Sequence, residues 1–359
     1  MIEREIPIEP KKVDVIKAFF WTDKALYILD QRKLPHKELF IKAENLERVR
    51  GAIKNMLVRG APAIGIVSAI GFYLGAKELS HQMRFPCETK RVIKALIKIK
   101  DKLATTRPTA VNLFWALERM FKKVKKNLSE AEILKKEDWD LILDTLKEEA
   151  LNIWAEDLEA NLKMGEFGAK LLPEGGILTY CNTGALATGG YGTALGVIRK
   201  AIEDGKDILV FAAETRPFLQ GARLTAWELS KLNLSYKIIT DNSVGFSMKR
   251  GLIKAVILGA DRIARNGDTA NKIGTYSLSI LAKYHQIPFY VCAPSSTFDL
   301  SLSSGKDIPI EERNPKEVLL CSGKRVAPKK ANALNLVFDI TPAENISGFI
   351  TEKGIIYPP

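Results

Sequence analysis

A cysteine at the mouth of a glycine-rich turn is the first candidate for chemistry in this chain. Cys181 ends an apolar run within TYCNTGALATGGYGTALGVIR (179–199), and an amide, hydroxyls and glycines follow it before a helical pattern begins. A thiolate is a nucleophile and a base. The three histidines, His36, His81 and His285, lie far from it in the sequence, so the turn itself supplies no Cys-His pair.

Polar groups also follow four further apolar runs. They are Glu214-Thr215-Arg216-Pro217 with Gln220-Gly221, Asp241-Asn242, Gly259-Ala260-Asp261-Arg262 and Pro294-Ser295-Ser296-Thr297-Phe298-Asp299. Asn271-Lys272-Ile273-Gly274 is expected to open the next helix. One such group is usually a helix cap. Five successive strand ends carrying a thiol, a carboxylate, two arginines and a lysine indicate a site with an anion-binding half and an acid/base half.

Phosphate is the natural anion for such a site. Glycine-rich turns let backbone N–H groups approach a phosphate, and helix N-termini favour its charge. The motif RGAPAIG (59–65) places Arg59 before an apolar helix, and Arg107 precedes Pro108 at the next helix. An arginine beside the free N–H groups of a helix start can bind a phosphate well. The alternative is that it is an ordinary surface arginine.

Other cofactor classes fit the residues less well. GYGTALG (190–196) departs from the GxGxxG dinucleotide fingerprint because its last glycine comes one residue late. Glu214 ends a strand as a ribose-binding acid would, but Thr215-Arg216-Pro217 follows at once. The four cysteines form no CxxC pair, which disfavours zinc, and the scattered histidines disfavour a Ser-His-Asp triad.

The net charge of +12 allows a nucleic-acid surface. Much of the excess lies in KRVIKALIKIKDK (90–102) and KKVKK (122–126), where the lysines oppose an apolar helical face and no RNA-binding aromatics interleave. A solvated surface therefore explains them, and nucleic-acid binding is not expected. The polar start and the short apolar stretch 63–76 predict a cytoplasmic, soluble protein without a membrane span.

The elements that must position these groups change in kind along the chain. Residues 1–40 are expected to form short strands and turns, and the periodic stretches 45–56, 63–79, 91–103, 107–124 and 139–171 predict helices. From Gly176, short apolar runs alternate with helical patterns, at 177–180, 208–212, 237–240, 255–259, 289–293 and finally 337–340. The interpretation is an α/β protein. It has a mainly helical N-terminal domain with a small β element (1–150) and a Rossmann-like, doubly wound parallel-sheet domain (151–359).

Together these stretches resemble the 5-methylthioribose-1-phosphate isomerase family, in the superfamily of the regulatory subunits of translation initiation factor 2B. The matching stretches cover nearly the whole chain in order: LDQRKLP, RGAPAIG, RPTAVNLFWAL, CNTGALATGGYGTALGVIR, ETRPFLQGARLTAWEL, DNSVGFSM, GADRIARNGDTANKIGTY and PFYVCAPSSTFD.

The resemblance implies a homodimer that needs no metal or organic cofactor. It implies an isomerase that converts 5-methylthioribose 1-phosphate, a small sugar phosphate, to 5-methylthioribulose 1-phosphate in methionine salvage. Cys181 and Asp261 match the catalytic residues. The matching substrate-binding positions are Arg59, Gly60, Ala61, Arg107, Gln220, Asn271 and Lys272.

Two related classes of protein must be distinguished from this enzyme. Ribose-1,5-bisphosphate isomerases share the cysteine and the GAD…NKIGT core, but a second phosphate would need a second cation cluster. ALATGGYG and SSTFD resemble the methylthio branch. The non-enzymatic regulatory subunits usually lack the catalytic cysteine and aspartate, and both residue types are present here. Proton transfer through Cys181 and hydride transfer past it both remain open.

Overall fold

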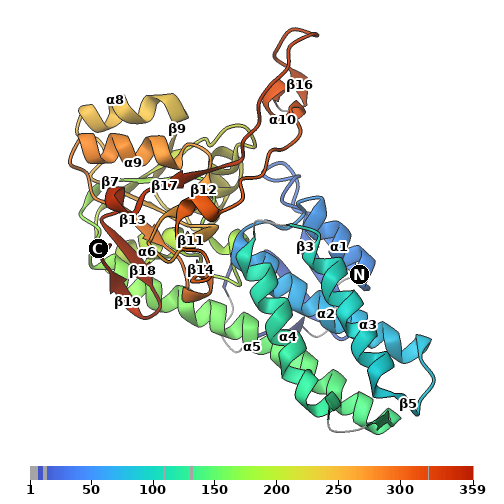
Figure 1. The fold of residues 1–359 in the computed structure, drawn as a ribbon. Coiled ribbons are helices and arrows are strands. Elements are labelled where there is room, and N and C mark those ends of the chain that lie inside the picture. Colours follow the sequence, from blue (N-terminus) through green and yellow to red (C-terminus); the bar gives the residue numbers. More distant parts are fainter. Residues whose placement is uncertain (1–6, 11–13, 108–109, 130–131, 322, 359) are drawn as a thin grey trace. The chain divides into compact units, whose positions relative to one another are not determined.

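The computed structural model describes residues 7–10, 14–107, 110–129, 132–321 and 323–358 (Figure 1). The chain packs into two compact units. The first comprises Met1–Glu159 with Leu186–Gly190, and the second comprises Ala160–Ala185 with Tyr191–Pro359. A domain boundary near residue 150 stays a prediction.

The N-terminal unit begins with the expected small β element. Its four strands form an antiparallel sheet in chain order: β1 (Pro7–Ile8), β2 (Phe19–Thr22), β3 (Leu26–Leu29) and β4 (Phe40–Ala43). All four residues of β3 are buried, and the rings of Phe20 and Tyr27 stack across the β2–β3 pair at 4.7 Å. Such cross-strand pairs stabilise a sheet of short strands.

Helices make up most of the rest of this unit, as the periodicity predicts. They are α1 (Leu46–Lys54), α2 (Ala61–Gln82), α3 (Thr89–Ala104), α4 (Val111–Ser129) and the part of α5 (Lys136–Ala169) up to Glu159, and β5 (Cys87–Glu88) pairs with β6 (Ile133–Leu134). The side chain of Asn45 accepts a hydrogen bond from the Arg48 N–H, which explains why α1 begins at Leu46.

The apolar helix α2 is the core of the N-terminal unit. It has 22 residues, so it is longer than the apolar stretch 63–76 suggests. By length and composition it could cross a membrane, but 83% of its most apolar window is buried inside the protein. A Cβ atom at Gly71 would lie 2.7 Å from Val49 Cγ1, and one at Gly75 would lie 3.0 Å from Ile99 Cγ2. These glycines therefore let α1 and α3 pack closely on α2.

The second unit contains the predicted parallel sheet. Its strands are β7 (Gly175–Thr179), β8 (Ile208–Ala213), β9 (Tyr236–Ile239), β10 (Ala255–Leu258), β13 (Phe289–Cys292), β18 (Gly348–Thr351) and the antiparallel edge strand β19 (Gly354–Ile356). Their order in the sheet is β19-β18-β13-β10-β7-β8-β9. The strand order reverses between β7 and β10, so the topological switch point of a doubly wound sheet lies there. The predicted fold class is confirmed.

Helices cover both faces of this sheet, as a parallel sheet requires. Neighbouring residues of β7 point to opposite sides. Ile177 packs in an apolar cluster with α6 (Ala194–Glu203), whereas Leu178 packs in another with α8 (Val244–Lys249) and α9 (Thr275–Tyr284). Figure 1 shows α8 and α9 side by side. The helix expected after Gln220 starts as a π-helix at Gly221–Thr225 and continues as α7 (Ala226–Lys231).

The last predicted strand is present, but the expectation that it joins the parallel sheet is wrong. The strand at Val337–Ile340 is β17 (Phe338–Thr341), which joins a separate four-stranded sheet. That sheet has the order β14 (Phe298–Asp299), β11 (Arg262–Ala264), β12 (Thr269–Lys272) and β17. In the parallel sheet β18 follows β13 instead.

The expectation that Asn271-Lys272 opens a helix is also wrong. Both residues end β12, and α9 begins at Thr275. Strands of three or four residues that carry polar side chains show no clear alternation in the sequence. The pairing of β12 with β17 joins segments that are far apart in the sequence. Before β17 come the short helix α10 (Lys316–Leu319) and the antiparallel pair β15 (Leu320–Cys321) and β16 (Lys324–Arg325).

Candidate active site

Cys181 and Asp261 follow the two strands that flank the switch point. β7 and β10 are parallel neighbours, with Ile177 opposite Ala255 and Leu178 opposite Val256. The turns beyond them touch, since a Cβ atom at Gly259 would lie 3.1 Å from Thr183 Cγ2. Ligands of doubly wound proteins bind in the crevice at this place.

The cysteine lies in an apolar environment. Cys181 is 8% exposed and belongs to a buried cluster that includes Tyr180, Leu258 and Ile263. Its backbone has a φ of +62°, in the left-handed region that residues with a side chain seldom adopt. The structure therefore holds a mostly buried thiol in an unusual backbone conformation.

The turn after β10 brings three predicted site residues together. The Asp261 N–H donates to Ala270 O at 2.9 Å, which ties Asp261 to the strand that carries Asn271 and Lys272. Lys272 is buried, its Nζ donates to Val337 O at 2.9 Å and lies 4.2 Å from the centre of the Phe338 ring. A buried cation of this kind suits an anionic ligand.

Gln220 comes after β8 in the chain and directly precedes the π-helix at Gly221–Thr225. A Cβ atom at Gly221 would lie 1.7 Å from Ala213 O and 3.1 Å from Thr215 Oγ1, so only glycine allows this approach. Gln220 is 5% exposed, and its Oε1 has no hydrogen-bond partner among the described residues. Buried amide oxygens are normally bonded, so this atom is available to a ligand or a water molecule.

Two carboxylates near these turns have raised pKa values. Burial raises the pKa of Asp241, although the N–H groups of Thr215 and Arg216, each at 2.7 Å, oppose the shift. Burial raises the pKa of Asp339 to about 6, against the N–H groups of Gly274 at 2.7 Å and Tyr276 at 3.1 Å. Asp241 was recognisable as a strand-end residue, whereas nothing near Asp339 in the sequence marks it as partly buried.

Tyr180, beside the cysteine, connects the two turns. Its hydroxyl donates to Ile273 O at 2.9 Å, and burial raises the pKa of this phenol well above its usual value of 10. A Cβ atom at Gly274 would lie 2.3 Å from the same hydroxyl. Sequence analysis missed Tyr180 because it looks like an ordinary core residue at the end of a strand.

The other predicted residues, Arg59, Gly60, Ala61 and Arg107, belong to the N-terminal unit. Gly60 precedes α2 with a φ of +92°, and a Cβ atom there would lie 2.5 Å from Ala187 O. A Cβ atom at Gly65 would lie 3.0 Å from the Asn112 carbonyl oxygen, so the N-terminal turns of α2 and α4 are in contact. Arg59 and Arg107 therefore precede two adjoining helix starts. Pro108 lies outside the described residues.

The turn Leu186–Gly190 is held within the same unit. Gln31 Nε2 donates to Leu186 O at 2.8 Å, and Trp154 Nε1 donates to Gly189 O at 2.7 Å. The Gly189 N–H in turn donates to Asp157 Oδ2 at 2.7 Å. The packing thus joins three stretches that stand apart in the sequence, LDQRKLP, RGAPAIG and GALATGG.

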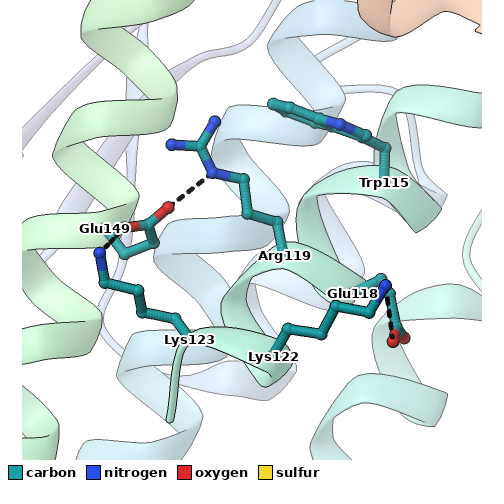
Figure 2. A pocket seen from close by; sticks show the side chains of 6 residues that line it. All are labelled: Trp115, Glu118, Arg119, Lys122, Lys123 and Glu149. Carbon is teal, nitrogen blue, oxygen red and sulfur yellow. Dashed lines mark hydrogen bonds and ion pairs between the residues drawn. The ribbon is translucent and has the colours of Figure 1, made fainter.

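A cavity of about 510 Å³ lies on the N-terminal unit and contains none of the predicted site residues (Figure 2). Its lining residues come from α4 and α5: Trp115, Glu118, Arg119, Lys122, Lys123 and Glu149. Buried Glu149 pairs with Arg119 Nε at 2.5 Å and with Lys123 Nζ at 2.9 Å. The charged side chains that line the cavity thus form ion pairs largely with one another. Among the described residues, no three His, Cys, Asp or Glu side chains gather as a metal site would need.

Comparison with known proteins shows to which family the chain belongs. The model of the initiation factor 2 subunit family matches residues 57–358. The methylthioribose-1-phosphate isomerase of Thermosipho africanus is 54% identical over 340 residues, which cover 94% of each chain.

Two solved structures share the fold over almost the whole chain. The crystal structure of 5-methylthioribose 1-phosphate isomerase from Pyrococcus horikoshii OT3 superposes with a TM-score of 0.86 at 45% identity, covering 98% of this chain and 96% of that one. The translation initiation factor eIF-2B, subunit delta, from A. fulgidus gives a TM-score of 0.79 at 45% identity, covering 96% of both chains. The chain therefore belongs to the initiation factor 2 subunit family, together with its methylthioribose-1-phosphate isomerases.

Proposed function

We propose that the protein is an aldose–ketose isomerase that converts 5-methylthioribose 1-phosphate to 5-methylthioribulose 1-phosphate in methionine salvage. Its relatives at 52–54% identity carry the name of this enzyme. The observation that carries the proposal is that Cys181 and Asp261 follow the two strands that flank the switch point. A thiol and a carboxylic acid are the two groups that such an isomerisation can use.

The roles of the two residues follow from the substrate. The sugar carries its phosphate on the anomeric carbon, so its ring cannot open as that of a free sugar does. Asp261 donates a proton to the ring oxygen as the bond from C1 to that oxygen breaks. A hydrogen then passes from C2 to C1, and the C2 hydroxyl loses its proton as the ketone forms, which returns a proton to Asp261. The atoms balance without an external oxidant or reductant.

Two routes for the migrating hydrogen fit the burial of Cys181. In the proton route, the Cys181 thiolate takes the hydrogen from C2 and returns it at C1. In the hydride route, Cys181 and the apolar cluster shield a cationic intermediate from water. Both routes favour a dry site.

The remaining predicted residues are proposed to bind the substrate. Lys272 and Arg59 supply positive charge for the phosphate, and Gln220 Oε1 offers a buried acceptor to a hydroxyl group. Gly60, Ala61, Arg107 and Asn271 complete the proposed set. We expect no metal or organic cofactor in the reaction and a cytoplasmic location.

The protein is further proposed to act as a homodimer. Tyr276, Ile280 and Tyr284 recur every four residues along α9 and are exposed, and Phe246 is exposed on neighbouring α8. Exposed apolar patches of this kind mark interaction surfaces. These four residues, called the α8–α9 face below, carry no charge in a chain whose net charge is +12, so two like-charged copies can approach there.

A parallel assay tests the substrate. Purified protein is incubated with 5-methylthioribose 1-phosphate or with ribose 1,5-bisphosphate, in the presence of EDTA. We expect turnover of the methylthio compound that EDTA does not reduce. Preference for the bisphosphate would assign the chain to the sister activity. Turnover of neither compound would contradict an isomerase and favour a regulatory subunit, the class named by the relative from A. fulgidus.

A further inference from the structure

The backbone of Cys181 is held from both sides by threonine hydroxyls. Its N–H donates to Thr215 Oγ1 at 2.9 Å, and its carbonyl oxygen accepts a hydrogen bond from Thr225 Oγ1 at 2.6 Å. Thr215 and Thr225 are fully buried. A left-handed conformation of a residue with a side chain is unfavourable and persists only where its surroundings enforce it. The two threonines are among the groups that hold it here.

Thr215 is itself fixed in place. Its hydroxyl donates to Ala213 O at 3.0 Å, so the oxygen lone pairs are left to accept the Cys181 N–H. Its own backbone has a φ of +63°, and its N–H donates to Asp241 Oδ1 at 2.7 Å. The position of the Thr215 hydroxyl therefore depends on the end of β8 and on the turn after β9.

Thr225 is oriented by a second pair of polar side chains. Asn182 Nδ2 donates to Glu228 Oε1 at 2.6 Å and to Thr225 Oγ1 at 3.3 Å. Because the Thr225 oxygen accepts from the amide, its hydrogen is directed to the Cys181 carbonyl. Glu228 lies on α7 and is 1% exposed, and its carboxylate lies against Gly184, where a Cβ atom would be 2.3 Å from Oε2. A buried network of this kind rigidifies the groups that it connects.

We propose that Thr225 is a positioning residue for the thiol of Cys181, itself oriented through Asn182 and Glu228. It fixes the peptide group after Cys181 and thereby the direction of the Cα–Cβ bond. This inference rests on the proposed function, in which Cys181 is a reacting group. Misplacing a reacting group by 1 Å costs on the order of 10²-fold in rate, so loss of the hydroxyl is felt in kcat rather than in substrate binding.

The test compares Thr225→Val, which keeps the branched shape without the hydroxyl, with Thr225→Ser, which keeps the hydroxyl. We expect kcat of Thr225→Val to fall on the order of 10- to 100-fold with little change in KM. Thr225→Ser should recover most of kcat. The matched control is Thr351→Val on β18, because Thr351 is also buried and its hydroxyl donates to Gly354 O at 2.9 Å. It should lose stability without losing kcat.

A second readout does not depend on the substrate. The rate of alkylation of Cys181 by iodoacetamide, followed by peptide mass spectrometry to separate it from Cys87, Cys292 and Cys321, should change about tenfold in Thr225→Val and stay unchanged in Thr351→Val. If the wild type turns over neither sugar phosphate, the proposed function fails, and the alkylation rates alone decide the positioning role.

Three outcomes would overturn the positioning role. They are a kcat of Thr225→Val within twofold of wild type, a Thr225→Ser that is as slow as the valine variant, and equal alkylation rates in wild type and Thr225→Val. Melting temperatures establish that each variant is folded. Thr225→Ala takes the place of the valine variant, with the same expected results, if the branched side chain prevents folding.

Discussion

The proposed role of Asp261 is the one that an isosteric substitution tests most directly. Asp261→Asn keeps the shape of the side chain but removes the proton that it would donate to the ring oxygen. General acid catalysis contributes about 10²–10⁴-fold, so kcat should fall by that factor while substrate affinity changes little. Steady-state kinetics together with calorimetric substrate binding measure both quantities. Activity close to that of the wild type would remove Asp261 from the mechanism.

The substitutions at Cys181 separate the two routes for hydrogen. If the thiolate carries the hydrogen, Cys181→Ser should be nearly inactive because a hydroxyl is a far poorer base. If the thiol shields a cation, Cys181→Ala should keep a measurable rate. Substrate deuterated at C2 gives an independent answer by mass spectrometry of the product. Loss of label to water supports proton transfer, and wild-type rates in both variants would contradict either role.

At the scale of elements, Glu149 links α4 to α5. Burial opposes its ionisation, but hydrogen bonds from Lys123 and Arg119 outweigh burial and lower its pKa. The stabilisation is therefore present above the ordinary pKa of 4.5 and is lost as the pH falls through the lower folded value. Glu149→Gln should reduce the free energy of unfolding at pH 7 by about 2 kcal/mol, less than for a fully buried pair because Lys123 is half-exposed.

Urea unfolding measures this change, and Glu118 from the same cavity is the matched control (Figure 2). The Glu118 side chain is 45% exposed and contacts Lys100 at 3.0 Å and Lys122 at 3.9 Å. Exposed pairs contribute roughly 0–1 kcal/mol, so Glu118→Gln should change stability little. An equal loss in the free energy of unfolding in the two variants would show that the burial of Glu149 does not make its ion pairs more stabilising.

Asp339 joins the start of α9 to β17 and should titrate in the range of ordinary assays. Its folded pKa of about 6 lies above the usual 3.8, so between these values the folded protein binds more protons than the unfolded chain. The contribution of this group to stability therefore decreases as the pH rises from about 4 to 6. In a pH titration by NMR, the amide signals of Gly274 and Tyr276 should shift with a midpoint near 6. Asp339→Asn should abolish this titration, and flat signals in the wild type would contradict it.

At the scale of the whole molecule, the α8–α9 face should join two copies. Light scattering at micromolar concentration should give twice the chain mass of 39.9 kDa. Ile280→Glu places a charge in the middle of the face and should yield monomers, because an unpaired charge is costly in an apolar interface. Val326→Glu, at another exposed apolar residue, should leave the dimer intact. A wild-type mass near 40 kDa, or a dimer in Ile280→Glu, would exclude this face.

Much of the fold was already determined by local patterns in the sequence. The alternation of short apolar runs with helical periodicity from Gly176 onward predicts the strands β7, β8, β10 and β13 and the parallel sheet, and the structure has them. The polar groups at the carboxyl ends of the strands are equally visible, because they follow directly on apolar runs. Cys181 and Asp261 could therefore be chosen as candidates without coordinates, although their chemical roles stay predictions.

Only the tertiary structure decided which of these groups meet and which are buried. That β10 lies beside β7 depends on the strand order, which no local pattern contains. Glu228 looks like any solvent-facing residue of an amphipathic helix, but the packing of α7 buries it against Gly184 and Asn182. The sheet of β11, β12, β14 and β17 escaped prediction because its short polar strands are stabilised by pairing across the chain. Local composition sets the propensity of a segment to form a helix or a strand, whereas burial and strand pairing depend on residues distant in sequence. Such distant residues, Thr215 and Thr225, also hold the backbone of Cys181.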